Sequence, residues 1–289
     1  MISLPIPTKK IDLLIRQWGK AALWLNSILA FFFLYAPIII LIIYSFNQSR
    51  SNAIWRGFTL SWYLDLLAGL LGTGTPTNMQ IWDALGNSLI IGGVSTILAT
   101  ILGTAIGLGM ERFRFPGRTM LEGLLFLPIV IPDITMGISL LIFFSVLFQL
   151  LEAITGVRLV LGLSTVIIGH VSFNISYVAV VVRSRIAELD PALEEAASDL
   201  GANEWKTFQR ITLPLIAPGI LSGALLAFTL SLDDFVITFF TNGVGSTTLP
   251  VFVYGMIKIS ITPAINAIST IMLLLSVGIV ISSLALQRR

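Results

Sequence analysis

The chain contains no cysteine and carries little charge for its length. None of its 289 residues is cysteine, which excludes disulfides and thiolate metal sites. Only 11% of the residues are charged, whereas a typical soluble domain has about 25%. So few charges cannot coat a chain that is 56% hydrophobic, so lipid is the expected solvent for most of its surface.

The sequence motifs of several enzyme and binding classes are also missing. There is no G-x-x-x-x-G-K-[ST], and the glycine-rich run 69–74 lacks the lysine that would bind phosphate. There is no H-E-x-x-H or G-x-S-x-G, and the single histidine, His170, cannot form a catalytic zinc site, which needs three protein ligands. No basic stripe with interleaved aromatics predicts nucleic-acid binding. We therefore expect no catalysis, metal or cofactor in this chain.

Six apolar segments are long enough to cross a membrane, which takes roughly 20 residues. They predict an all-α, polytopic membrane protein in which residues 1–20 precede a single transmembrane domain of residues 21–289. In the third and longest segment, Pro128 and Pro132 predict a kink or a break. The predicted spans are 21–46, 88–110, 120–150, 164–182, 217–240 and 264–286.

The basic residues divide unevenly between the two sides of the membrane. Six crossings place both termini on one side, and if that side is the cytoplasm, 13 of the 17 Lys and Arg residues lie inside. Cytoplasmic segments carry an excess of these residues, so we expect both termini in the cytoplasm. The basic residues expected outside are Arg50, Arg56, Arg158 and Lys258.

The inner loop of about 183–215 contains the start and stop signals of a short helix. Asp190 can accept hydrogen bonds from the first free amides, and Pro191 suits the first helical position. Gly201 suits the left-handed residue just past the end of the helix. These signals alone fit an ordinary amphipathic connector lying on the membrane.

A second short helix is predicted to begin at Asn203 and to continue to about Arg210. Pro214 and Pro218 then limit its extension into the next span, because proline has no amide to donate. Two helices that meet at a glycine would form a compact projection into the cytoplasm.

One spaced pattern in this loop is long and specific: E-A-A-x3-G-x9-I-x-L-P. It resembles the signature loop of permease subunits of binding-protein-dependent ABC importers, and this resemblance implies a type I ABC importer permease fold. In that family the loop forms a coupling helix that docks in a cleft of a cytoplasmic ATPase. Carried over to this chain, the resemblance implies that the docking element is formed by Glu195, Ala196, Ala197 and Gly201. It implies that this element is joined to the next span by Ile211, Leu213 and Pro214.

Further segments look like those of polyamine permeases, above all the second permease of spermidine/putrescine importers. This resemblance implies a location in the bacterial plasma membrane and three kinds of protein partner. These partners are an ABC ATPase dimer that binds ATP and Mg, a second homologous permease, and a periplasmic or extracellular substrate-binding protein. The segments that carry the resemblance are 57–63, 84–89, 132–134, 231–236, 247–250 and 260–267.

Three acidic residues fall within predicted spans, where an ionised carboxylate is costly and normally faces a bundle interior or a watery path. Asp133 lies near the middle of the third span, and Asp233 and Asp234 lie in the outer half of the fifth. Neighbours on a helix point about 100° apart, so only one of that pair can face a lumen squarely. Aromatic faces also attract organic cations, which makes Tyr177 and Tyr254 weaker pathway candidates. Structural pairing of the acids and core packing of the tyrosines remain the alternatives.

Other kinds of protein share parts of this pattern. An ion-coupled secondary transporter also crosses the membrane repeatedly, but such transporters usually show internal repeats, and no clear repeat is present. A membrane scaffold would need neither acids in its spans nor an ATPase-docking loop. Among importers, another cationic or amine-bearing solute fits three acids as well as a polyamine does.

Overall fold

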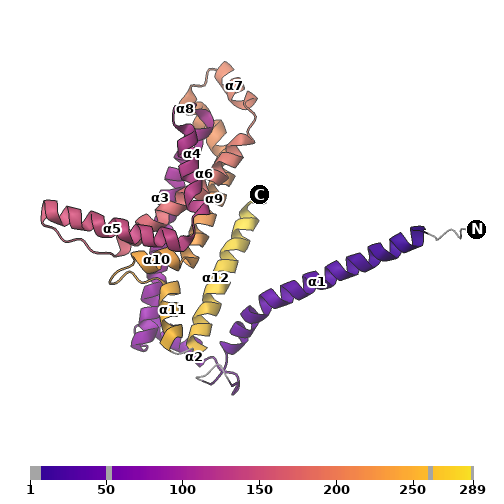
Figure 1. Ribbon diagram of the computed structural model, residues 1–289, viewed down its shortest axis with the longest axis vertical. Coiled ribbons are helices and arrows are strands. Elements are labelled where there is room, and N and C mark those ends of the chain that lie inside the picture. The colour runs from indigo at the N-terminus through magenta and orange to yellow at the C-terminus, as the bar shows by residue number, and fades with distance from the viewer. Residues whose placement is uncertain (1–7, 50–53, 260–262, 288–289) are drawn as a thin grey trace, which may run out of the picture. The chain divides into compact units, whose positions relative to one another are not determined.

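The computed structural model describes residues 8–49, 54–259 and 263–287 (Figure 1). Every regular element in these residues is a helix, and their one isolated β-bridge pairs Asn47 with Phe58. Two compact units can be distinguished, one within residues 1–64 and 261–272 and the other within 65–260 and 273–289. The predicted all-α class is confirmed, whereas the single transmembrane domain stays a prediction.

The first unit is dominated by α1 (Thr8–Tyr44), which begins earlier than the predicted span and contains Pro37 without ending there. The apolar window of its Trp18–Tyr44 part has no buried residue within the chain, as expected for a helix that faces lipid. Two hydrogen bonds join the end of α1 to the start of α2 (Ser61–Leu70). Tyr63 Oη lies 2.6 Å from Ser45 Oγ, and Trp62 Nε1 donates to the Asn47 carbonyl at 2.8 Å.

The second unit is built around α3 (Pro76–Arg112), α6 (Leu163–Ala187) and α9 (Leu213–Asp233), which lie against one another (Figure 1). Val178, Val182 and Ile216 are fully buried where α6 and α9 meet. These three helices therefore form the core on which the remaining elements are placed.

The start of α3 lies well before the predicted span 88–110. Thr75 caps the helix by accepting the Asn78 amide, and Pro76 occupies the first turn, where its missing amide costs nothing. At 1.5 Å per residue a 37-residue helix is about 55 Å long, so α3 extends well beyond a hydrocarbon core of about 30 Å. The segment between the first two predicted spans is thus partly helical, and its residues 71–75 form a short turn between α2 and α3.

The predicted interruption of the third span is confirmed. The segment divides into α4 (Arg118–Val130) and α5 (Asp133–Thr155), with Pro132 between them, while Pro128 lies inside α4. Since α4 has only 13 residues, α5 alone is long enough to cross the membrane. A Cβ atom on Gly137 would lie 2.6 Å from Cδ2 of Phe240, so α5 packs closely against α10 (Val236–Thr241).

The prediction of one continuous fifth span over 217–240 is wrong, because the helix stops after Asp233 and resumes as α10. The Asp234 carboxylate accepts the amides of Ile237 and Thr238 and so caps a new helix start, in competition with continuation of α9. A further helix that the sequence analysis missed, α11 (Leu249–Ile259), follows α10 and packs against α3.

Five helices in the described part of the chain are long and apolar enough to cross a membrane. They are Trp18–Tyr44, Pro76–Arg112, Asp133–Thr155, Leu163–Ala187 and Glu204–Asp233. The 25-residue α12 (Pro263–Gln287) corresponds to the sixth predicted segment. The chain is therefore a multi-pass membrane protein whose helices match the six expected spans, with breaks in the third and the fifth.

Close packing of α3 on α6 generates a prediction about Gly103. A Cβ atom there would lie 2.8 Å from Cβ of Val178 and 2.9 Å from the Ile175 carbonyl oxygen. We expect Gly103→Ala to destabilise the chain by about 1–3 kcal/mol, because overpacking outweighs the better helix propensity of alanine. Thermal unfolding of the purified chain in detergent measures the change. Gly93→Ala, in the same helix with no atom within 4 Å, is the control; equal unfolding temperatures of the two variants would contradict the prediction.

Candidate functional site

The short helix predicted within residues 183–215 is present as α7 (Ala192–Asp199). Asp190 Oδ1 accepts the Ala192 amide at 3.0 Å, as expected of a capping residue. Gly201 has φ +84°, the left-handed conformation predicted just past the helix end. The local signals in the sequence are therefore confirmed here.

The second short helix does not end before the next span, contrary to the prediction from Pro214 and Pro218. Asn203 caps α8 (Glu204–Thr207), which continues through a π-helical turn, η1 (Phe208–Thr212), directly into α9. In the π turn the Leu213 amide bonds to the Phe208 carbonyl. The wider turn accommodates the ring of Pro214, which in a regular α-helix would clash with the carbonyl four residues earlier. No loop therefore separates α8 from a membrane-spanning helix.

The residues of the E-A-A-x3-G pattern are largely accessible. Glu195, Ala196 and Gly201 are exposed, whereas Ala197 is buried at 7% exposure. Large apolar side chains also reach the surface near them, with Leu200 at 90% and Trp205 at 63% exposure. Such a mixture of small, apolar and acidic side chains on a projecting helix pair is typical of a surface that another protein covers. We call this the α7–α8 surface; Figure 1 shows α7 and α8 at one end of the second unit.

The residues that continue the pattern lie in the helical connection. Ile211 and Leu213 are half-buried, and Pro214 is exposed. Arg185 on α6 donates from Nε to the Leu215 carbonyl at 3.3 Å, which holds this connection against α6. These three residues of the pattern therefore lie between the α7–α8 surface and the spans.

Beneath α7, one carboxylate joins three elements. Glu194 on α7 accepts hydrogen bonds from Arg112, the last residue of α3, and from the hydroxyl of Thr212, the last residue of η1. Arg112 Nη2 also donates to Thr212 Oγ1 at 3.3 Å. Sequence reasoning missed all three residues, because nothing in the sequence pairs position 112 with position 194.

The electrostatics of this cluster favour the ionised form of Glu194. Burial acts to raise the pKa of its carboxyl, but the hydrogen bonds from Arg112 and Thr212 and the Arg112 charge outweigh burial and lower the pKa below its usual 4.5. Glu194 is therefore ionised at neutral pH. The ion pair between Arg112 and Glu194 is therefore formed at neutral pH and is lost only as the pH falls through the lowered pKa of Glu194.

A cleft of about 940 Å³ lies beside this cluster and runs under α7. Its walls come from the end of α3, the end of α6 and both helices of the loop. Exposed acids line it, and Glu195 among them makes no ion pair in the described part of the chain. The acidic residues of its lining are Glu111, Asp190, Glu194, Glu195, Asp199 and Glu204.

The three candidate pathway acids all lie at helix breaks. Asp133 is not mid-helix, as its place in the span predicted, but is the exposed first residue of α5, where a helix N-terminus favours negative charge. Asp233 is the exposed last residue of α9, and Asp234 follows it in the break. Discontinuous membrane helices are a recurring way to form solute sites within a bilayer.

Asp234 is largely committed to contacts within the chain. Its Oδ2 atom accepts the Thr238 hydroxyl at 2.8 Å and lies 3.2 Å from Nε2 of His170. His170, fully buried on α6, also lies 2.9 Å from Thr238 Oγ1. These contacts hold the α9–α10 break against α6 and leave Asp233 as the exposed member of the pair.

The two candidate tyrosines lie in different surroundings. Tyr177 is half-buried and makes an edge contact with Phe173 on the same helix, at 6.5 Å between ring centroids. Tyr254 is 40% exposed, lies 4.6 Å from the Phe235 ring in the α9–α10 break, and receives the Lys258 ammonium at 4.7 Å. Only Tyr254 is thus shown in direct contact with a break.

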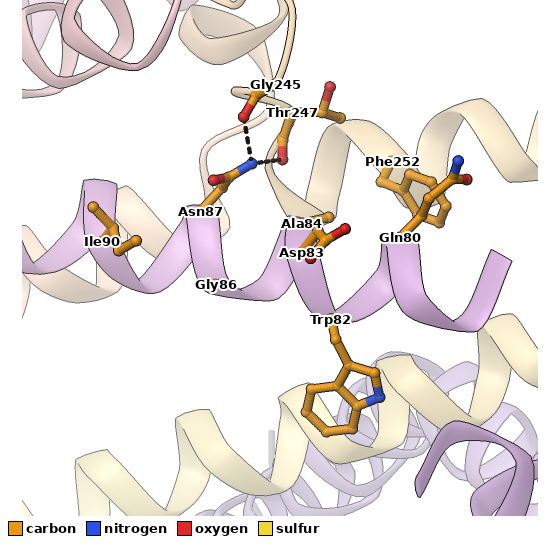
Figure 2. A pocket seen from close by; sticks show the side chains of 10 residues that line it. All are labelled: Gln80, Trp82, Asp83, Ala84, Gly86, Asn87, Ile90, Gly245, Thr247 and Phe252. Carbon is orange, nitrogen blue, oxygen red and sulfur yellow. Dashed lines mark hydrogen bonds between the residues drawn. The ribbon is translucent and has the colours of Figure 1, made fainter. Parts of the chain in front are cut away.

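A second cleft, of about 700 Å³, lies between the N-terminal half of α3 and the segment that leads into α11. Figure 2 shows Asn87 on α3 donating from Nδ2 to the carbonyls of Gly245 and Thr247, both at 3.0 Å. The Leu249 amide donates to Ser88 Oγ at 2.9 Å. Two segments distant in the sequence are thereby joined, 84–89 and 247–250, both of which resemble polyamine permeases.

Among the residues that the structure describes, no three His, Asp or Glu side chains lie close enough together to hold a metal ion.

Comparison with known proteins assigns the chain to a family. The model of the family described as "Binding-protein-dependent transport system inner membrane component" matches residues 99–289. The chain is 44% identical over 254 residues to the putrescine transport system permease protein PotI of Escherichia coli (strain K12), covering 88% of this chain and 85% of that protein. It is 38% identical over 256 residues to the spermidine/putrescine transport system permease protein PotC of the same strain, covering 89% and 90%.

The fold has a counterpart among solved structures. It matches a chain of a bacterial ABC transporter involved in the import of the acidic polysaccharide alginate with a TM-score of 0.76 and 20% identity, covering 97% of this chain and 99% of that chain. The matched family model spans most of the sequence, including the whole α7–α8 surface and both helix breaks. The chain therefore belongs to the family of inner membrane components of binding-protein-dependent transport systems.

Proposed function

We propose that the chain is the permease subunit of an ABC importer that moves polyamines, such as putrescine or spermidine, across the bacterial plasma membrane. One observation carries the proposal: the E-A-A residues lie on α7, and the turn at Gly201 joins α7 to the continuous helical path from α8 into a membrane span. The similarity to PotI and PotC supports the substrate class.

The partners follow from this role. An ABC ATPase dimer seats on the α7–α8 surface and supplies ATP and Mg²⁺, since this sequence has no nucleotide motif of its own. A second, homologous permease completes the translocation path, and a periplasmic or extracellular binding protein delivers the substrate. Both termini lie in the cytoplasm, as the excess of basic residues on that side supports. Arg50, Arg288 and Arg289, which enter that count, lie outside the described residues.

Transport results from rigid-body motion. ATP binding closes the ATPase dimer and displaces α7 and α8, and the continuous path from α8 through η1 into α9 carries this displacement into the membrane. The bundle rotates toward an outward-open state and receives substrate from the binding protein. Hydrolysis returns the bundle to an inward-open state.

The helix breaks supply the polar surface that a cation needs within the bilayer. Asp133 and Asp233 are exposed at two breaks whose flanking helices, α5 and α10, pack on each other. A polyamine carries several separated positive charges, so spaced carboxylates suit it better than one site. Asp234 stabilises the second break by accepting backbone amides of α10. Tyr254 adds an aromatic face beside this break, and Tyr177 is a more distant candidate.

Uptake into proteoliposomes tests this function. The chain, its second permease, the ATPase and the binding protein are reconstituted, and uptake of labelled putrescine and spermidine is measured. We expect uptake that requires ATP and the binding protein and that persists when ion gradients are dissipated. Uptake that survives without ATP but collapses with the gradient would identify a secondary transporter, and ATP-driven uptake of a different amine would replace the polyamine as substrate.

Gly201→Val tests the coupling role of the loop. Valine in the left-handed region costs about 1–2 kcal/mol, and no neighbouring atom lies within 4 Å of the new Cβ, so strain is the only direct effect. We expect lower uptake and weaker stimulation of the ATPase by the loaded binding protein. Gly201→Asn is the matched control, because asparagine tolerates this conformation. Wild-type uptake and stimulation in the valine variant would refute the coupling assignment.

Asp133→Asn tests the substrate pathway. Loss of the charge removes attraction for a cation while shape is preserved, so we expect a higher KM for uptake with normal assembly of the complex. Glu152→Gln, an exposed acid at the other end of α5, is the control. Unchanged uptake kinetics at all polyamine concentrations would remove Asp133 from the pathway.

A further inference from the structure

The contacts of Glu194 bear on how movement of α7 reaches the membrane. The helix has only eight residues and is joined to its neighbours by the turns 188–191 and 200–203. Backbone turns can bend, so a displaced α7 moves the spans only if something ties it to them.

Glu194 connects α7 to two other elements through its side chain. Through Arg112 its carboxylate holds the C-terminal end of α3, the helix at the centre of the bundle. Through Thr212 it holds the end of the π turn from which α9 begins. Thr212 is fully buried, so its hydroxyl is held in place by the surrounding helices and does not move independently of them.

Glu194 and Glu195 are adjacent on α7 but differ in their contacts. Glu195 is exposed and makes no ion pair in the described part of the chain, so its carboxylate is available to a partner. Glu194 is partly buried, with its side chain 29% exposed, and it faces Arg112. Glu194 thus bonds the chain's own helices, whereas Glu195 lines the same cleft without an ion pair in the described residues.

We propose that Glu194, Arg112 and Thr212 form a transmission node, in which Glu194 is a positioning residue that conveys the displacement of α7 to both α3 and α9. This inference rests on the proposed function and adds to it the internal link between the ATPase-docking surface and the spans. The ionised state of Glu194 at neutral pH, a consequence of its lowered pKa, keeps the link formed under the conditions of transport.

The node is distinct from an ordinary ion pair at the same end of the molecule. Arg185 Nη1 and Glu188 Oε2 also pair, at 2.9 Å, but Arg185 lies in the last turn of α6 and Glu188 directly follows that helix, with its side chain 67% exposed. That pair connects α6 to the residue that follows it and does not tie α7 to α3 or α9. It therefore provides a matched control of the same charge type in the same loop.

The experiment measures two quantities in the reconstituted complex: ATPase bound per permease, and polyamine taken up per ATP hydrolysed. For Glu194→Ala we expect normal ATPase binding and uptake per ATP reduced by roughly fivefold or more, the usual scale of coupling between two sites. Thr212→Val, which removes only the hydroxyl, should lower the same ratio to a smaller extent. Glu188→Gln should leave both quantities unchanged.

A charge exchange guards against simple misfolding. The double variant Glu194→Arg with Arg112→Glu restores an ion pair between α7 and α3, and we expect it to recover uptake per ATP relative to either single variant. Wild-type uptake per ATP in Glu194→Ala, or no recovery in the double variant, would overturn the node. Loss of ATPase binding in Glu194→Ala would also overturn it, since Glu194 would then belong to the docking surface. Failure of the proposed function is a separate result: the wild-type complex would show no ATP-driven uptake.

Discussion

Backbone amides and carbonyls in lipid have no water to bond, so every interruption of a membrane helix must be satisfied by the chain itself. This requirement explains how the two breaks of this chain can exist. At the α9–α10 break the Asp234 carboxylate receives two amides, and His170 and Thr238 complete its contacts. At the α4–α5 break the Ile131 amide bonds back to Leu127, and Pro132 has no amide to satisfy. The acidic residues of the spans thus lie at the helix breaks, where side chains and nearby carbonyls satisfy the irregular backbone.

Backbone hydrogen bonding also explains the path from α8 into α9. A proline four residues after a helical carbonyl would normally end or kink the helix, but the π turn before Pro214 opens enough space for the path from α8 to α9 to remain continuous. Because of this continuity, one side of the α7–α8 surface is rigidly joined to a span. The other side, α7 itself, contacts the ends of α3 and η1 through the side chain of Glu194.

Local signals predicted local structure well. The capping role of Asp190, the left-handed Gly201 and the break at Pro132 each depend on a few adjacent residues, and each was predicted correctly. Errors arose where a local signal competed with another: Thr75 started α3 early, Asp234 ended α9 early, and the π turn overrode the prolines.

The sequence by itself determined that the chain resides in lipid, which six segments are apolar enough to cross it, and which loop carries the E-A-A-x3-G pattern, because apolar length and residue spacing are properties of the linear chain. Only the tertiary structure decided which charges meet. Arg112 and Glu194, or His170 and Asp234, are far apart in the sequence, and their pairing depends on how α3, α6, α7 and α9 pack. Side-chain contacts between helices are set by three-dimensional packing, so no spacing rule along the chain could have revealed them.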